Sequence, residues 1–249
     1  MNEFLNKLNQ IDKELNNNSV HQQVSEINKI IACIDQKQVI RHAPNRLGFY
    51  PDEMEFLTEE IGKEHERLIK AINNLLNSFR QYLSLHYGIW SLPNLRTAQL
   101  IKEKYDANSA LEVMSGNAYW SKALNDVGLQ VIATDSLEWA KTSSTGKKKF
   151  LQVENLDAIK AIEKYQNVDL IICSWAPNFG HSDVKLIKAW QASASNSKLL
   201  FIGEKDGATN SGTFWSQAQF VHSKQLDEIN KSFSNFDFID EKIYEVKKI

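Results

Sequence analysis

The 249-residue sequence has few cysteines and no long apolar segment. Its two cysteines, Cys33 and Cys173, lie far apart, and the chain contains no CxxC pair or His/Cys cluster. We therefore expect two free, buried thiols in a reducing compartment and no metal site. The longest apolar runs are about half as long as a membrane span requires, and the polar N-terminus lacks the apolar core of a signal peptide. These absences predict a soluble, cytoplasmic protein with no membrane partner.

The sequence also lacks an excess of either charge. Its formal net charge is −2, whereas nucleic-acid-binding domains usually carry a basic face. A nucleic-acid partner is therefore disfavoured, although a local basic face stays open as an alternative. Apolar residues make up 42% of the chain, which is enough to build the core of one large domain or of one domain with a helical extension.

Residues 1–85 carry the apolar spacing of helices. Phe4, Leu8, Ile11 and Leu15 recur at three- and four-residue intervals, and the pattern continues over residues 20–34. The segment 41–53 contains two prolines and a glycine, so we expect a loop there, followed by one long helix over residues 54–83. These stripes predict a helical N-terminal region that serves as a lid or as interaction helices. A homodimer formed through these helices is the sharper alternative.

From residue 86 to 249, apolar runs of strand type alternate with helical patterns. The runs SALEV, LQVIAT, KFLQV, VDLIICS and KLLFIG are rich in Val, Ile and Leu, as is typical of strands buried on both faces. This alternation predicts an α/β fold, with a doubly wound, mostly parallel Rossmann-like sheet after the helical region. Ligands of such sheets bind beyond the carboxyl ends of the strands, so the residues that end the strands are candidate site residues.

The turn after the first strand and the acid that ends the second indicate a nucleoside-type ligand. Small residues at positions 115, 116 and 118 allow backbone N–H groups to approach a ligand. Met114 does not, because its side chain occupies space that a glycine would leave open. The carboxylate of Asp135, at the end of the second strand, can accept hydrogen bonds from ribose hydroxyls. A helix N-cap is the alternative role for that acid.

Residues 87–214 resemble a class I family of Rossmann-fold, S-adenosylmethionine-dependent methyltransferases with an SWPP-type fourth motif. The segment EVMSGNA, residues 112–118, is similar to the acidic, glycine-rich first motif, with Met114 and Ala118 where glycines are usual. The run DLIICSWAPNFG is similar to the fourth motif, and LLFIGEKDGATNSGTFW is similar to the segment after the fifth strand. YGIWSLPNLRTAQLI resembles the segment that covers the cofactor.

The resemblance implies S-adenosylmethionine as the cofactor and an unknown methyl acceptor. It implies cofactor contacts at Glu112, Met114, Ser115, Gly116, Ala118, Asp135, Asp157, Ala158 and Ser174. In that family the acid matched by Asp135 binds the ribose, and Asp157 and Ala158 would lie beside the adenine. The resemblance further implies four catalytic or substrate-facing residues, Trp175, Pro177, Asn178 and Glu204. The family's sheet usually ends in an antiparallel pair, whereas the last residues here offer one good strand.

Three functions stay open at this point. A methyltransferase is the first, with a small molecule or a protein favoured as acceptor, because Trp175 occupies the polar position of the enzymes that methylate nucleic-acid amines. The second is a catalytically degenerate scaffold that binds a partner, which Met114 and the altered fourth motif support. The third, a nicotinamide-dependent oxidoreductase, requires a GxGxxG spacing that this loop lacks.

Overall fold

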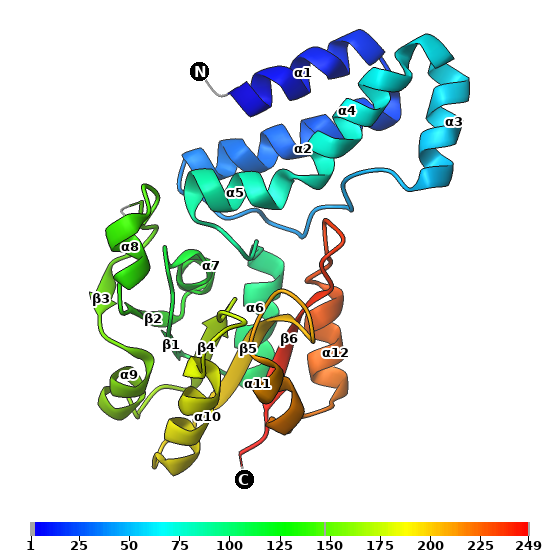
Figure 1. Ribbon diagram of the computed structural model, residues 1–249. Helices are drawn as coiled ribbons and strands as arrows, with labels where there is room; N and C mark the ends of the chain where they lie inside the picture. The colour runs from blue at the N-terminus through cyan, green and yellow to red at the C-terminus, as the bar shows by residue number, and fades with distance from the viewer. Residues whose placement is uncertain (1–2, 147, 249) are drawn as a thin grey trace.

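The computed structural model describes residues 3–146 and 148–248, and it places a layer of helices over one end of an α/β half (Figure 1). The helical region contains α1 (Glu3–Leu15), α2 (Asn18–Asp35), α3 (Pro51–Ile61), a 3-10 turn (Lys63–His65), α4 (Glu66–Asn77) and α5 (Phe79–Tyr87). The predicted apolar stripes are buried: Leu8 on α1, Ile27 on α2 and Ile72 on α4 are all fully covered. Burial of these stripes against one another holds the helices together.

The single long helix expected over residues 54–83 is wrong. The chain breaks at Gly62, whose φ of 113° lies outside the helical region, and again at Ser78 between α4 and α5. The loop also ends earlier than expected, because Pro51 is the first residue of α3. Proline suits this position since the first turn of a helix leaves its N–H groups without partners, and the Glu53 carboxylate accepts a hydrogen bond from the Tyr50 N–H.

The second half is a six-stranded sheet in the order β3-β2-β1-β4-β5-β6. Its strands are β1 (Ser109–Glu112), β2 (Gln130–Asp135), β3 (Val153–Asn155), β4 (Leu170–Ser174), β5 (Lys198–Glu204) and β6 (Glu241–Val246). All neighbouring pairs are parallel except β5 and β6, which run antiparallel. This arrangement confirms the predicted doubly wound, mostly parallel α/β sheet. The third strand is shorter than KFLQV suggested and begins at Val153.

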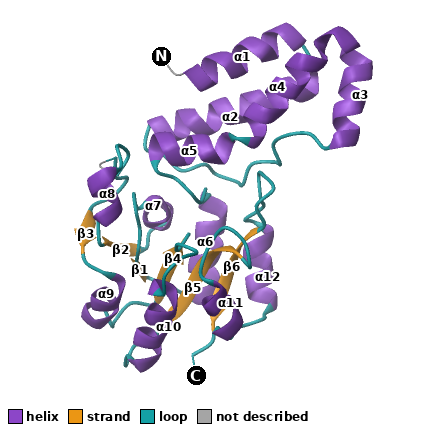
Figure 2. Ribbon diagram, in the orientation of Figure 1, coloured by secondary structure: helices purple, strands orange, loops and turns teal. Residues whose placement is uncertain are grey.

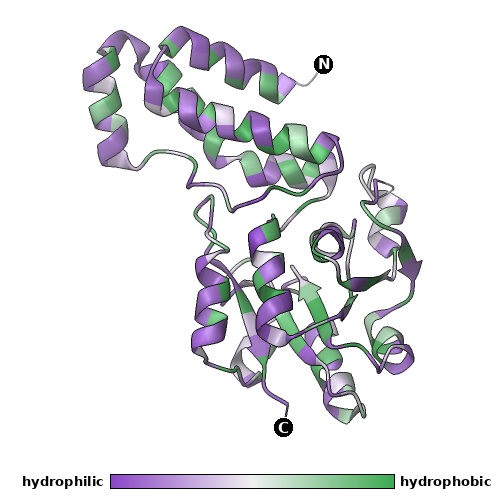
Figure 3. Cartoon of the chain, turned by 180° about the vertical axis from the view of Figure 1, so that it is seen from behind, coloured by the Kyte–Doolittle hydropathy of each residue, from purple (hydrophilic) through white to green (hydrophobic). Residues whose placement is uncertain are grey.

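Helices cover both faces of the sheet (Figure 2). They are α6 (Leu95–Tyr105), α7 (Tyr119–Asp126), α8 (Glu138–Thr142), α9 (Ala158–Lys164), α10 (Ser182–Ala192), α11 (Gly212–Gln217) and α12 (Lys224–Lys231). Strand β4 shows the alternation: Leu170 and Ile172 join the core under α6, α7 and α12, whereas Ile171 and Cys173 join the core under α9, α10 and α11. The central strands β4 and β5 are accordingly mostly hydrophobic in Figure 3.

The apolar core of the helical region continues into one face of the sheet. One cluster of buried side chains runs from Leu8 and Ile72 through Phe79 to Trp120 on α7 and Ile229 on α12. The helical region is therefore packed against the α/β half. Cys33 is partly exposed, not buried as expected, and both cysteines are free thiols. Within residues 3–146 and 148–248, no helix has the length and hydropathy needed to cross a bilayer.

Candidate functional site

A cavity of about 540 Å³ opens beyond the carboxyl ends of β1, β2 and β4. Its volume lies within the range of about 300–1,000 Å³ that is usual for small-molecule sites. The strand order reverses between β1 and β4, and such switch points are where ligands of open α/β sheets bind. Glu112, Asp135 and Glu138 bring three carboxylates to the wall, and its described residues include no Lys or Arg. The cavity therefore suits a ligand that carries positive charge.

The loop after β1 adopts backbone angles that glycine favours, although two of the residues that adopt them are not glycine. Met114, Gly116 and Ala118 have φ angles of 52°, 52° and 60°, all in the left-handed region. That region costs a residue with a Cβ roughly 1–2 kcal/mol. Strain of this kind persists where the surrounding structure enforces it, and it is concentrated at functional sites. The Met114 side chain lines the cavity without closing it.

Asp135 ties the first two strands together at the floor of the cavity. Its Oδ2 accepts a hydrogen bond from the Gly116 N–H at 2.9 Å, and its Oδ1 accepts one from the Leu137 N–H at 2.6 Å. A carboxylate offers about four acceptor positions, so each oxygen can accept one further hydrogen bond. Because Asp135 also lines the cavity, these remaining positions are available to a ligand.

Glu112 is a buried carboxyl beneath the same loop, only 2% exposed. Its Oε2 accepts hydrogen bonds from the backbone N–H and the hydroxyl of Ser121, in the first turn of α7. Burial raises the pKa of Glu112 to about 7; the bonds from Ser121 oppose this shift and the nearby Asp135 charge adds to it. Oε2 thus takes the role of a helix cap, since Ala118 has no capping side chain. No hydrogen bond from a described residue reaches Oε1.

Two buried polar atoms beside the loop have no hydrogen-bond partner among the described residues. They are the Ser115 hydroxyl and the Asn117 Oδ1, and both residues line the cavity. A buried polar group left without a partner costs about 1–3 kcal/mol. The backbone at Gly116 is also open, because a Cβ built there would meet no atom within 4 Å. These features fit a polar ligand lying against residues 115–117.

The opposite wall of the cavity comes from the segment after β4. Ser174, Trp175, Pro177 and Asn178 all line it, as the fourth-motif resemblance implied. Trp175 also has a left-handed φ of 52°, and its backbone N–H donates to the Ile202 carbonyl at 2.8 Å. Its ring stacks on Trp90, with the ring centroids 5.6 Å apart. Trp90 belongs to the segment that precedes α6, and Gly88 and Ser91 of that segment also face the cavity.

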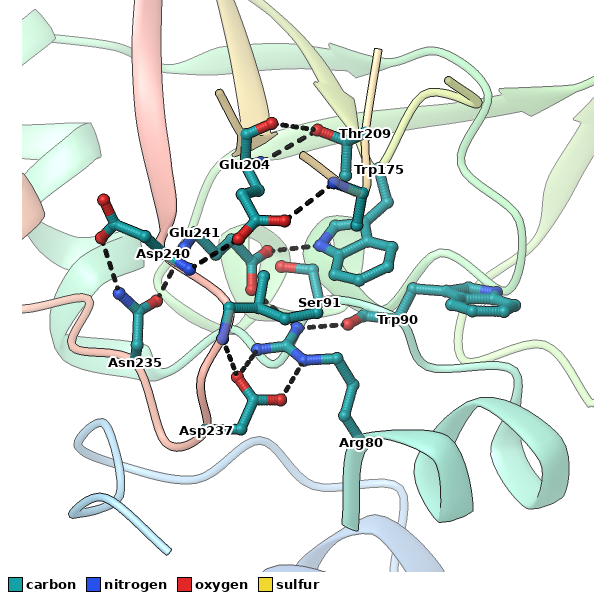
Figure 4. A network of polar contacts seen from close by, with 12 residues as sticks. Arg80, Trp90, Ser91, Trp175, Glu204, Thr209, Asn235, Asp237, Asp240 and Glu241 are labelled. Carbon is teal, nitrogen blue, oxygen red and sulfur yellow. Dashed lines mark hydrogen bonds and ion pairs between the residues drawn. The ribbon is translucent and has the colours of Figure 1, made fainter. Parts of the chain in front are cut away.

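A buried ion-pair network supports this wall from behind (Figure 4). Arg80 of α5 donates to both oxygens of Asp237, at 2.6 and 3.0 Å, and to Glu241 Oε2 at 2.8 Å. The same guanidinium donates to the Trp90 carbonyl, and Glu241 Oε1 accepts from the Trp175 indole N–H at 2.8 Å. Burial alone would lower the pKa of Arg80, but attraction to Glu241 and the bonds to Asp237 raise it above its ordinary value.

This network was not predicted from the sequence. Arg80 is separated from Asp237 by 157 positions and from Glu241 by 161. One signal was present: Arg80 lies on the buried stripe of the helical region, four residues after Leu76 and three before Leu83. A charge on an apolar stripe requires a buried partner. Glu138 and Trp139 also line the cavity. They were not predicted, because they lie outside the motifs recognised in the sequence.

Several residues named from the sequence lie outside the cavity lining. Asp157 caps α9, accepting from the backbone N–H groups of Ile159 and Lys160, and Ala158 is the first residue of that helix. Glu204 accepts from the backbone N–H groups of Ala208 and Asp240, at 2.8 and 3.1 Å, so both carboxylate oxygens are turned toward the loops. Ala118 is fully buried and serves the turn itself. The loop 41–53 also contributes no residue to the cavity wall.

Comparison with known proteins adds structural similarities alone. No protein-family model matches the chain, and no curated protein matches it. Among solved structures, a SAM-dependent methyltransferase from Archaeoglobus fulgidus has a TM-score of 0.38 and 11% identity, over 62% of this chain and 95% of that chain. TehB from Haemophilus influenzae has a TM-score of 0.40 and 15% identity, over 68% of this chain and 67% of that one. Similarity at this level does not by itself identify a ligand or a reaction.

Proposed function

We propose that the protein is an S-adenosylmethionine-dependent methyltransferase whose cofactor occupies the cavity above β1 and β2. The observation that carries the proposal is the Asp135 carboxylate, held by the Gly116 N–H at the switch point with acceptor positions free toward the cavity. The sequence resemblance over residues 112–118 and 170–181 supports the same ligand. A nicotinamide dinucleotide is less suited to this site, because its pyrophosphate would add negative charge beside Glu112 and Asp135.

The residues present fit the parts of this cofactor. Asp135 would accept from the ribose hydroxyls, and the free Oε1 of Glu112 would face the cationic amino group. The orphaned Ser115 hydroxyl and Asn117 Oδ1 would gain polar partners. When bound, the sulfonium supplies an activated methyl group for in-line transfer to a nucleophile. The protein's own contribution is then mainly to orient the two reactants and exclude water, which can be worth several kcal/mol.

The acceptor lies on the side of Trp175, Pro177 and Asn178 in this proposal. Glu204 is not assigned as a general base, because it does not line the cavity and its two carboxylate oxygens accept from the backbone N–H groups of Ala208 and Asp240. A small molecule or a protein side chain is favoured over nucleic acid as the acceptor, since the described wall carries three acidic side chains and no Lys or Arg. The degenerate-scaffold alternative lost its main support, because Met114 leaves the cavity open.

Calorimetric titration with S-adenosylhomocysteine tests this function. We expect micromolar binding by the unchanged protein and loss of that binding in Asp135→Ala. The matched control is Asp157→Ala, which removes a helix cap outside the cavity; it should lower stability by about 1 kcal/mol and leave the affinity unchanged. Absence of heat and of a thermal shift at millimolar ligand in the unchanged protein would refute the proposal, and equal losses in both variants would remove Asp135 from the site.

A further inference from the structure

The part of the cavity away from Asp135 is bordered by large aromatic rings. Trp90, Trp175 and Phe179 line it. Trp90 is 48% exposed and Phe179 is 76% exposed, which is unusual for side chains of this size. Exposed rings around the mouth of a cavity indicate a surface that a ligand covers.

Two of these rings form a wall whose position is fixed. Trp90 and Trp175 are stacked with 30° between their planes. Trp175 is tethered through its indole N–H to Glu241, and the Trp90 backbone carbonyl is tethered to Arg80 (Figure 4). Arg80 and Glu241 pair with each other, so the Trp175 ring and the Trp90 backbone are held by the same buried ion pair. A ligand that stacks here loses little free energy to ordering the protein.

The charges of the cavity lining disfavour a negatively charged acceptor. Glu112, Asp135 and Glu138 line the same cavity, and none of its described residues is Lys or Arg. Arg80 lies behind the wall, and its donors are taken by Asp237, Glu241 and the Trp90 carbonyl. A phosphate or carboxylate on the acceptor would lie in the same cavity as these acids, with no described Lys or Arg in the lining to act as its counter-ion.

We propose that the methyl acceptor is a planar aromatic compound without a negative charge, stacked against the Trp90–Trp175 wall. This inference rests on the proposed function and specifies its substrate class. An oxygen or nitrogen lone pair of the acceptor forms the new bond to the methyl carbon. The carbon–sulfur bond breaks and leaves its electron pair on sulfur, which becomes a neutral thioether. The proton that the acceptor loses passes to water at the open mouth.

Three compounds with one carbon skeleton test the acceptor class. In the presence of saturating S-adenosylhomocysteine, the affinities of 2-naphthol, 2-naphthyl phosphate and decahydro-2-naphthol are measured by calorimetry. We expect 2-naphthol to bind about tenfold tighter than 2-naphthyl phosphate because of like-charge repulsion, and about fivefold tighter than decahydro-2-naphthol because stacking contributes a factor of roughly two to ten. Equal or tighter binding of the phosphate or of the non-planar alcohol overturns the proposal, as does failure of all three to bind.

The first step of the same titration separates this inference from the proposed function. If S-adenosylhomocysteine itself does not bind, the methyltransferase proposal fails; if it binds and 2-naphthol does not, the substrate class alone fails. Trp90→Ala then locates the site, because it should weaken 2-naphthol about tenfold and S-adenosylhomocysteine by a much smaller factor. Trp90→Phe, which keeps a ring, should restore most of the 2-naphthol affinity. Equal weakening of both ligands by Trp90→Ala would contradict the wall as the acceptor site.

Discussion

The two ends of the cavity are built in different ways. The end that we assign to the cofactor comes from one short stretch, residues 112–118, and from Asp135 at the end of the adjacent strand. The acceptor end combines the segment before α6, the loop after β4 and the start of β6, and its support comes from Arg80 in the helical region. The first end is a local motif, whereas the second exists only once distant parts of the chain have packed together.

Replacing Arg80 should have the largest effect, because it removes the support of the acceptor end of the cavity, which depends on long-range contacts. Arg80→Met leaves Asp237 and Glu241 buried without their partner, which should lower the free energy of unfolding by about 3–5 kcal/mol. Urea denaturation measures this loss. The control is Arg67→Met, which removes an exposed arginine of α4 and should change stability by less than about 0.5 kcal/mol. Similar stabilities for the two variants would show that the network does not hold the helical region in place.

The cofactor end should be sensitive to pH through Glu112. Its pKa is about 7 in the fold against an ordinary value of 4.5, so the folded protein binds more protons than the unfolded chain between these values. The stability of the unchanged protein should therefore fall, relative to Glu112→Gln, as pH rises from 4.5 to 7, and then level off. Chemical denaturation of both proteins across this range gives the difference. A constant difference would mean that Glu112 titrates normally.

The same carboxyl links pH to ligand affinity. Ionised Glu112 attracts the cationic amino group, so affinity for S-adenosylhomocysteine should rise with pH up to about 7. This rise should be absent in Glu112→Gln, which keeps an oxygen for Ser121 and loses the charge. An identical pH profile in both proteins would argue that the amino group lies elsewhere.

The smallest expected effect concerns the strained loop. Met114→Gly relieves a left-handed φ, but glycine also loses more conformational entropy on folding, so we expect a gain in stability below about 1 kcal/mol. Met54→Gly is the contrasting variant, because Met54 lies within α3 and glycine there should cost about 1 kcal/mol. Thermal denaturation of the two variants measures whether each substitution raises or lowers the stability. Destabilisation by Met114→Gly would show that its side chain contributes more by packing than its backbone costs.

The sequence predicted the local features better than the assembled ones. Apolar runs and helical spacing depend on neighbouring residues, and the strands at 109–112 and 170–174 lie where those patterns indicated. The interruption at Gly62 was missed because the apolar stripe continues across it. Asp157 and Glu204 lie at element ends as expected, but neighbouring backbone N–H groups take up their carboxylates. Whether a backbone N–H or a ligand binds such a carboxylate depends on the loop conformation, which the spacing of residues in the sequence does not specify.

The most direct test of the account is a crystal structure with S-adenosylhomocysteine bound. We predict the adenosine ribose within hydrogen-bonding distance of the Asp135 carboxylate, the amino group beside Glu112, and the sulfur directed toward Trp175. A ligand whose ribose makes no contact with Asp135, or one bound outside this cavity, would contradict the central claim.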